Sequence, residues 1–449
     1  MARFWCELAW LSGEQATSEV LIEVVADRIA SVSSGAECPS DATRLQGLTL
    51  PGLANAHSHA FHRALRGRTQ VGAGSFWTWR EVVYAASGRL QPDTYFRLAR
   101  AVYGEMALAG ITSVGEFHYL HHDVGGSAYA DSNAMSVALA AAAAEAGIRI
   151  TLLDCCYLHG GLSAAGHSTL NEAQQRFSDG SVEAWSQRAE AASVLNSPTC
   201  RVGAAIHSVR AVDATSIEKI AEWAAASDLP LHAHVSEQQA ENEQCVAAYG
   251  LTPTALLGEH GAIGKSFTAV HATHLAGADF GQLGRAECTV CLCPTTERDL
   301  ADGIGSALAL RNEGARLAMG SDSQAVIDLF VEARGIELHE RLATHVRGSH
   351  DAPSLLTAAC ANGQRSLGWL DAGELAVGRL ADFITLRLDT VRTAGSPASS
   401  ALETAVFAGA AADVYHSVVG GKVIVADGHH RRIDVARELH ATITELMDA

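Results

Sequence analysis

The segment Asn55-Ala56-His57-Ser58-His59 carries two histidines one residue apart at the end of an apolar run. In a β-strand the side chains at positions i and i+2 point to the same face, so the two imidazoles would converge on one point. Imidazole nitrogens are common ligands of zinc and similar divalent ions. A lone His-x-His pair is a weak sign of a metal site, so its place in the fold decides its meaning.

Three more residues of metal-binding type stand at the ends of other predicted strands: His234, His271 and Asp322. Because they are far apart in sequence, they can meet only if a barrel gathers the carboxyl ends of its strands. Histidines with one carboxylate suit zinc or a similar divalent ion, which lowers the pKa of bound water from 15.7 to about 7. Glu237 follows His234 closely and could move protons there, or it could simply begin the next helix. We interpret His232, deeper on the face of His234, as a buried support.

The elements that would position these residues form a repeated strand-and-helix pattern between about residues 48 and 323. Short β-branched or apolar runs alternate with stretches of helical spacing, such as Pro92–Ala109 and Ala134–Ala146. Eight such units predict a (β/α)8 TIM-type barrel rather than an open sheet. The predicted strands are Leu48–His59, Ile111–His118, Ile148–Tyr157, Arg201–His207, Pro230–Val235, Ser266–His271, Glu287–Cys293 and Arg316–Asp322.

Both ends of the chain differ from this middle part. The runs Val20–Val25 and Asp382–Leu386, and a Gly-Gly hairpin signal within Val418–Val425, are typical of antiparallel strands. Two β segments at opposite ends are most simply joined in space as one small domain. We therefore predict that 1–47 forms the N-terminal part of a β-sandwich, that 48–370 forms the metal-dependent barrel, and that 371–449 completes the sandwich and adds a closing helix from about residue 432.

Composition excludes several classes of protein. Hydrophobic residues make up 48% of the 449 residues, which is too many for a disordered chain. With 50 acidic against 32 basic residues, the net charge of −18 argues against nucleic acid as a partner. No run is long enough for a membrane helix, and the segment Met1–Glu7 interrupts any signal peptide. We expect a cytoplasmic protein without a membrane partner, and the sequence leaves a monomer and a homodimer open.

Several of these segments together resemble the amidohydrolase superfamily, and within it the deaminase branch. The resemblance spans nearly the whole chain and is carried by Pro51-Gly52-Leu53-Ala54-Asn55-Ala56-His57-Ser58-His59, His234-x-x-Glu237, His271 and Ser321-Asp322-Ser323. It implies that one divalent metal ion per chain, preferably zinc, is bound by His57, His59, His234 and Asp322. It also implies that Glu237, His271 and Asp322 manage protons. The fourth strand ends in His207 and has no lysine, so the modified lysine that bridges two metals in other members is absent.

Further segments resemble a group within this branch that deiminates a formimidoyl amino acid with two carboxylates, in histidine degradation. These segments are Phe76–Glu81, Phe117–His122, His207–Val212, Cys293–Glu297 and Ala361–Arg365. The resemblance implies that a small dicarboxylate substrate is held by Arg80, Tyr119, His207 and Arg210, and the planar guanidinium fork suits a carboxylate well. His62 stands where this group often has a glutamine, so His62 could change the affinity or the preferred length of the acid.

Two alternatives remain open from the sequence. Another deaminase of the same superfamily would act on a purine-like ring, which does not require two arginines for carboxylates. A catalytically silent binding or assembly protein could also use this fold. The complete set of predicted metal ligands and proton-transfer residues argues against the silent protein.

Overall fold

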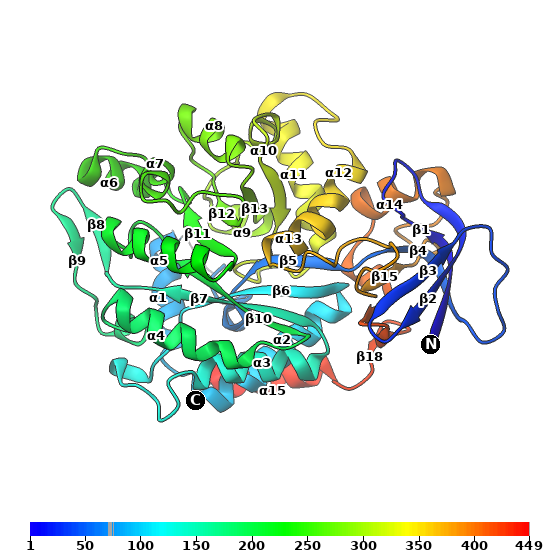
Figure 1. Ribbon diagram of the computed structural model, residues 1–449, viewed down its shortest axis with the longest axis horizontal. Helices are drawn as coiled ribbons and strands as arrows, with labels where there is room; N and C mark the ends of the chain where they lie inside the picture. Colours follow the sequence, from blue (N-terminus) through cyan, green and yellow to red (C-terminus); the bar gives the residue numbers. More distant parts are fainter. Residues whose placement is uncertain (71–73, 75, 449) are drawn as a thin grey trace.

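The computed structural model describes residues 1–70, 74 and 76–448. Two eight-stranded sheets and one two-stranded hairpin make up the described β structure. Figure 1 shows the barrel, with its helices around it, and the second large sheet at one side, where the first residues of the chain meet segments from near its end. The prediction of a barrel with a separate β domain is thus confirmed.

The barrel sheet contains eight parallel strands in the order of the chain. An isolated parallel bridge between Ser58 and Asp322 joins the ends of its first and last strands, so the sheet closes on itself. Several strands, for example β6 and β7, are buried at every position because side chains fill the barrel interior and helices cover its outside. The strands are β5 (Leu53–Ser58), β6 (Ile111–His118), β7 (Arg149–Cys156), β10 (Cys200–Ile206), β11 (Leu231–Val235), β12 (Phe267–His271), β13 (Thr289–Leu292) and β14 (Arg316–Met319).

The first predicted strand, Leu48–His59, is wrong as a single element. The structure divides it into β4 (Thr43–Pro51), which pairs with β15 (Phe383–Leu386) of the small domain, and β5 of the barrel. Gly52 lies between them, where a Cβ atom would stand 2.2 Å from Thr112 Oγ1, so the chain can change sheets there only without a side chain. Both halves are apolar and buried, and for that reason the hydrophobic pattern did not separate them. The residues 48–51 therefore pair in the small sheet and not in the barrel.

The small domain is one mixed sheet built from both ends of the chain. Its two parts join where β15 pairs antiparallel with β4. Its own apolar cluster includes Phe4, Ile22 and Val418. Gly420 and Gly421 have φ values of 55° and 71° and form the predicted hairpin turn. In sheet order the strands are β18 (His429–His430), β17 (Lys422–Ala426), β16 (Val414–Val419), β15 (Phe383–Leu386), β4, β1 (Ala2–Ala9), β2 (Thr17–Val25) and β3 (Arg28–Ser33).

The helices agree with the sequence signals where these were strong. The predicted helix 134–146 is α3, ended by Gly147 in the left-handed conformation, and the predicted helix from Pro92 ends at Leu108. The α-helices are α1 (Phe76–Ser87), α2 (Pro92–Leu108), α3 (Ala134–Ala146), α4 (Val182–Ala192), α5 (Ala214–Ala226), α6 (Gln239–Tyr249), α7 (Pro253–Glu259), α8 (Gly277–Arg285), α9 (Pro294–Asp299), α10 (Ala307–Asn312), α11 (Leu329–Thr344), α12 (Ala352–Thr357), α13 (Gly363–Ser366), α14 (Ala401–Phe407) and α15 (Val435–Asp448).

The closing helix α15 packs against the barrel, along α2, rather than against the small sheet (Figure 1). Ion pairs from Arg97 to Glu445 and from Arg100 to Glu438 fasten it there. Residue 449, the last residue of the predicted closing segment, lies outside the described residues. Within the described part of the chain, no helix is long and apolar enough to cross a membrane.

Candidate active site

Closure of the barrel brings the first and last strand ends together. The Asp322 amide donates to the His57 carbonyl at 3.1 Å, and the His59 amide donates to the Asp322 carbonyl at 3.3 Å. The side chain of Asn55 reinforces this junction, since its Nδ2 donates to Ser321 Oγ at 2.7 Å and its Oδ1 accepts from the Ser321 amide at 2.9 Å. The backbone of the barrel therefore holds the His-x-His pair against Asp322.

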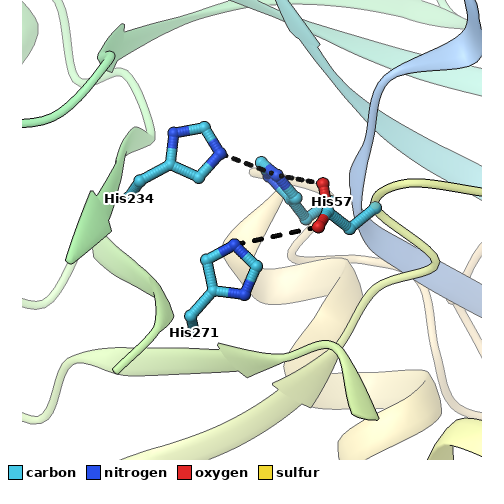
Figure 2. A group of neighbouring side chains, drawn as sticks. His57, His234 and His271 are labelled. Carbon is cyan, nitrogen blue, oxygen red and sulfur yellow. Dashed lines mark hydrogen bonds and ion pairs between the residues drawn. The ribbon is translucent and has the colours of Figure 1, made fainter. Parts of the chain in front are cut away.

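Four residues of metal-binding type meet at this point. The ligand atoms of His57, His234, His271 and Asp322 all lie within 4.8 Å of one another, and all four residues are buried. Figure 2 shows His234 and His271 reaching toward His57. The ligand set implied by the resemblance contains His59 in place of His271. His59 Nε2 nevertheless lies 3.4 Å from Asp322 Oδ1, as close as His57 Nε2 at 3.3 Å.

The hydrogen bonds of these histidines show that the donor set fits a cation. His59 Nδ1 donates to the Phe117 carbonyl at 2.9 Å, and His234 Nδ1 donates to the His207 carbonyl at 2.8 Å. A neutral imidazole with its proton on Nδ1 presents a lone pair at Nε2. The His59 lone pair thus faces the Asp322 carboxylate, and His234 Nε2 lies 3.2 Å from His57 Nε2. Converging lone pairs and a carboxylate are the environment that a divalent ion requires.

Burial and neighbouring charges together set the protonation states of this group. It lowers the pKa of His59 and His234 well below the usual value, so both imidazoles are neutral. Although burial opposes the change, His57 and His271 hold the pKa of the Asp322 carboxyl below its usual value. Burial also lowers the pKa of His271, but the opposing pull of Glu237, Glu297 and Asp322 raises that pKa to about 10. A bound cation would repel the His271 proton and lower this value again.

The strand ends at this site contain unusual backbone conformations. Ser236, His271, Ala272 and Asp322 have φ values of 51°, 68°, 52° and 35°, in the left-handed region that non-glycine residues avoid. Each such residue costs about 1–3 kcal/mol. The Ala272 amide donates to the Val235 carbonyl at 3.0 Å, which helps to hold this conformation. Such strain concentrates at functional sites, in agreement with the grouping of the side chains.

Glu237 stands in the loop between β11 and α6, before the helix begins at Gln239. The alternative that it starts the helix is therefore wrong. Its Oε2 accepts a hydrogen bond from Arg210 Nη2 at 3.0 Å, and its Oε1 lies 3.8 Å from His271 Nε2. We call His57, His234, His271 and Asp322 the metal-type group. Glu237 thus stands between this group and an arginine predicted to bind substrate. His232, in contrast, is fully buried and donates from Nε2 to the Ser366 carbonyl at 2.8 Å, as a support histidine should.

One cavity contains every residue predicted to bind substrate. Its floor includes His59, His234, Glu237 and Asp322. The five predicted residues form part of its walls: His62, Arg80, Tyr119, His207 and Arg210. Two tyrosines, a phenylalanine, a tryptophan and a valine line the remainder, so the cavity combines cationic groups with apolar surface above the metal-type group.

These wall residues are held by different contacts. The Arg80 guanidinium lies 4.7 Å from the centre of the Trp77 ring and 5.6 Å from that of Tyr84, as in a cation–π contact. His62 Nε2 lies 3.2 Å from Tyr119 Oη. Burial lowers the pKa of His62 to about 3, so this imidazole is neutral near pH 7. A neutral imidazole can donate or accept one hydrogen bond at each nitrogen, much as an amide side chain can.

Two buried carboxylates were missed by the sequence reasoning. Glu297, at the start of α9, lies 3.6 Å from His271 Nδ1 through Oε1 and accepts from the Cys293 amide at 2.8 Å. Glu241, in the first turn of α6, approaches Arg210. The only signal for Glu297 was its place in a segment of the resemblance. The sequence contained no signal for Glu241, because an acidic residue in the first turn of a helix is ordinarily solvated.

The fold and the site define a metal-dependent hydrolase on a barrel, and comparison with known proteins agrees. The profile of the amidohydrolase family matches residues 48–424. The chain therefore belongs to the amidohydrolase family and is a hydrolase that acts on C–N bonds.

Individual relatives are similar over most of their length. A formimidoylglutamate deiminase from Pseudomonas aeruginosa is 36% identical over 440 residues, which is 96% of each chain. An 8-oxoguanine deaminase from the same organism is 29% identical over 411 residues, or 89% of this chain and 87% of that one. The crystal structure of an amidohydrolase from Brucella melitensis superposes with a TM-score of 0.92 at 31% identity, covering 100% of both chains.

Proposed function

We propose that this enzyme hydrolyses N-formimidoyl-L-glutamate to N-formyl-L-glutamate and ammonia, a reaction of histidine degradation. The observation that carries the proposal is that Arg80 and Arg210 line the same cavity as His59, His234 and Asp322. Two guanidinium groups above a metal-type group, in a chain with a net charge of −18, suit a substrate with two carboxylates. The 36% identity to a formimidoylglutamate deiminase supports the same substrate.

We assign one divalent ion per chain, preferably zinc, to His57, His59, His234 and Asp322. When bound, such an ion acts as a Lewis acid that lets water react as a nucleophile near pH 7. The chain orients the imidazoles for this purpose. Backbone carbonyls accept hydrogen bonds from Nδ1 of His59 and His234, so that Nε2 of each ring is directed inward.

The remaining acidic and basic groups move protons. During hydrolysis the water oxygen bonds to the formimidoyl carbon, the bond from this carbon to the terminal nitrogen breaks, and both water protons end on the departing ammonia. Asp322 accepts a proton from the attacking water, and His271 Nε2 lies 3.8 Å from Asp322 Oδ2, where its positive charge can stabilise that carboxylate. Glu237, whose Oε1 faces His271, takes up the second water proton and delivers it to the leaving nitrogen, which receives the first proton from Asp322.

The wall residues bind the two carboxylates. Arg80 and Arg210 each pair with one carboxylate, with Tyr119 and His207 as further hydrogen-bond partners. His62 contacts Tyr119 and so affects how this tyrosine meets the substrate. Aromatic side chains line much of the cavity, and a surrounding of low polarity strengthens each charge-assisted hydrogen bond.

A substrate panel with ammonia release as the readout tests this proposal. The panel contains N-formimidoyl-L-glutamate, N-formimidoyl-L-aspartate, two analogues that each lack one carboxylate, 8-oxoguanine and 5′-methylthioadenosine. We expect the highest kcat/KM for N-formimidoyl-L-glutamate. Faster release from either purine compound would overturn the assignment in favour of a ring deaminase. Bound metal without turnover of any member would instead indicate a binding protein.

A further inference from the structure

Arg210 lies between two buried carboxylates, although the proposed reaction uses only one of them. Its Nη2 donates to Glu237 Oε2 at 3.0 Å, and its Nε lies 3.3 Å from Glu241 Oε2. All three side chains are at most 9% exposed, and that of Glu241 is fully buried. A guanidinium out of contact with water needs a nearby anion, because an uncompensated buried charge is strongly destabilising.

Glu241 is held in a position where it contacts Arg210 but does not line the substrate cavity. It lies in the first turn of α6, and its Oε1 accepts from the Ser236 amide at 3.1 Å. Ser236 has one of the left-handed backbone conformations at the site, so this hydrogen bond also holds the end of β11. Glu241 is not among the residues that line the substrate cavity. Its carboxylate therefore stands behind Arg210, on the side away from the substrate.

Glu237 is a poor permanent partner for Arg210. It lines the cavity, its second oxygen faces His271, and in the proposed reaction it gives up a proton to the leaving nitrogen. A carboxyl group loses its attraction for a guanidinium each time it is protonated. Glu241 has no such duty, and both Glu241 and Glu237 raise the pKa of Arg210 against the effect of burial.

We propose that Glu241 is the positioning residue of Arg210. Its carboxylate lies 3.3 Å from the Nε edge of the guanidinium, outside the cavity, so that Arg210 stays at the cavity wall to receive a substrate carboxylate while Glu237 exchanges protons. This inference rests on the proposed function, because it assumes that Arg210 binds one carboxylate of the substrate.

The physical consequence is a separation of binding from catalysis. With a neutral side chain at position 241, Arg210 keeps Glu237 as its remaining anionic partner, and a substrate carboxylate must compete with Glu237 for the guanidinium. Binding of the diacid is then weakened, whereas the proton-transfer groups and the metal-type group are unchanged. A residue needed only for stability would instead affect all substrates equally.

The test compares Glu241→Gln, Glu241→Asp and Arg210→Met with the parent enzyme loaded with zinc. Each is assayed with N-formimidoyl-L-glutamate, with N-formimidoyl-L-norvaline, which lacks the side-chain carboxylate, and with N-formimidoyl-4-aminobutanoate, which lacks the α-carboxylate. The matched control is Glu337→Gln. Glu337 is also a buried helical carboxylate that forms an ion pair with an arginine Nε, that of Arg341, at 2.7 Å and accepts a hydrogen bond from a backbone amide, but it lies outside the cavity.

We expect Glu241→Gln to raise KM for the diacid about tenfold or more, the effect of losing about 1.4 kcal/mol, with kcat within about threefold of the parent. Arg210→Met should identify the analogue without the carboxylate that Arg210 binds, because this analogue is insensitive to the loss of Arg210. The KM of that analogue should also be unchanged in Glu241→Gln. Glu241→Asp keeps the charge and should give an intermediate KM, and Glu337→Gln should leave both constants unchanged.

Each other result overturns the inference. If Arg210→Met weakens diacid binding and Glu241→Gln does not, positioning by Glu241 is wrong and the proposed function stands. If Arg210→Met itself leaves KM for the diacid unchanged, the assignment of Arg210 in the proposed function is wrong, and the inference about Glu241 that rests on it is wrong as well. If both Glu241 variants lower kcat/KM equally for all three substrates, the role of Glu241 is structural only. In the double variant Arg210→Met/Glu241→Gln, KM should equal that of Arg210→Met.

Discussion

The floor and the walls of the cavity are built in different ways. The floor residue His234 and the neighbouring His57 belong to barrel strands, and Asp322 is the third residue after β14, so the hydrogen bonds of the closed sheet fix their positions. The wall residues lie outside the strands: Arg80 on α1 is stacked on an aromatic ring, and Arg210 in the loop after β10 is held by carboxylates. In the proposed function, chemistry thus depends on the sheet, whereas substrate choice depends on helices and loops that can vary without disturbing the barrel.

The two regions also differ in charge. Burial keeps His59 and His234 neutral, so the floor can attract a cation, whereas the walls carry guanidinium groups that stay charged at every accessible pH. A substitution in the floor should therefore abolish the reaction. A substitution in the walls should change which substrates are used and how tightly they bind.

The largest effect is expected from removal of a proposed metal ligand at or beneath the floor. His57→Ala or Asp322→Ala should lower turnover by roughly 10³-fold or more, because the bound ion that activates water is lost. Metal analysis of the parent should find about one ion per chain, which a chelator removes together with the activity and zinc restores. Two tightly bound ions per active chain would contradict the single-metal assignment.

The boundary between floor and walls is tested at Glu237. Glu237→Gln keeps the shape of the side chain but not its titratable proton, so kcat should fall by roughly 10²- to 10⁴-fold. Metal content should equal that of the parent, since the assigned ligands are unchanged. Near-normal kcat would remove Glu237 from the reaction and leave it as a partner of Arg210.

Smaller and substrate-dependent effects are expected from the walls. Each charge-assisted hydrogen bond contributes about 1.5–3 kcal/mol, so Arg80→Met and Arg210→Met should each lower kcat/KM for the diacid by roughly ten- to over a hundredfold. The two analogues with one carboxylate serve as controls, because each should be insensitive to the loss of one arginine. If both variants process the diacid like the parent, the dicarboxylate assignment is wrong and the ring substrate becomes the better hypothesis.

Lowering the pH should reduce the stability that His232, the buried histidine beneath the floor, contributes to the folded chain. Burial lowers the pKa of His232 to about 3, whereas in the unfolded chain this group titrates near 6.5. Between these values the unfolded chain binds more protons, so the stability that His232 contributes is present above pH 6.5 and is lost as the pH falls. The slope is about 1.4 kcal/mol per pH unit. Thermal denaturation between pH 7.5 and 5 should show a shallower pH dependence for His232→Asn than for the parent.

The smallest effect is expected at His62 in the wall. His62→Gln keeps a hydrogen-bonding group near Tyr119, so KM for the diacid should change by only about two- to fivefold. Because the pKa of His62 is about 3, its substitution should not alter the dependence of KM on pH between 5 and 8. An altered pH profile in this range would show that His62 is charged when substrate binds.

The sequence predicted the barrel well because its signals are local. Each strand is an apolar run whose ends are recognisable, and helix boundaries such as Gly147 follow from backbone preferences of single residues. The prediction failed at Gly52, where two apolar strands of different sheets follow one another without a change in pattern. Periodicity reports that a segment is buried and extended, but it does not report which neighbour the segment pairs with.

Within the site the same division holds. The sequence by itself determined the residue types at the strand ends. From them it predicted a metal site on His57, His59, His234 and Asp322, with His271 and Glu237 nearby. Only the tertiary structure decided that Glu297 lies against His271 and that Glu241 stands behind Arg210. The physical reason is that these contacts join different βα units across the barrel mouth. Their distances depend on how the closed sheet sets each strand end relative to the others, which no local pattern of residues encodes.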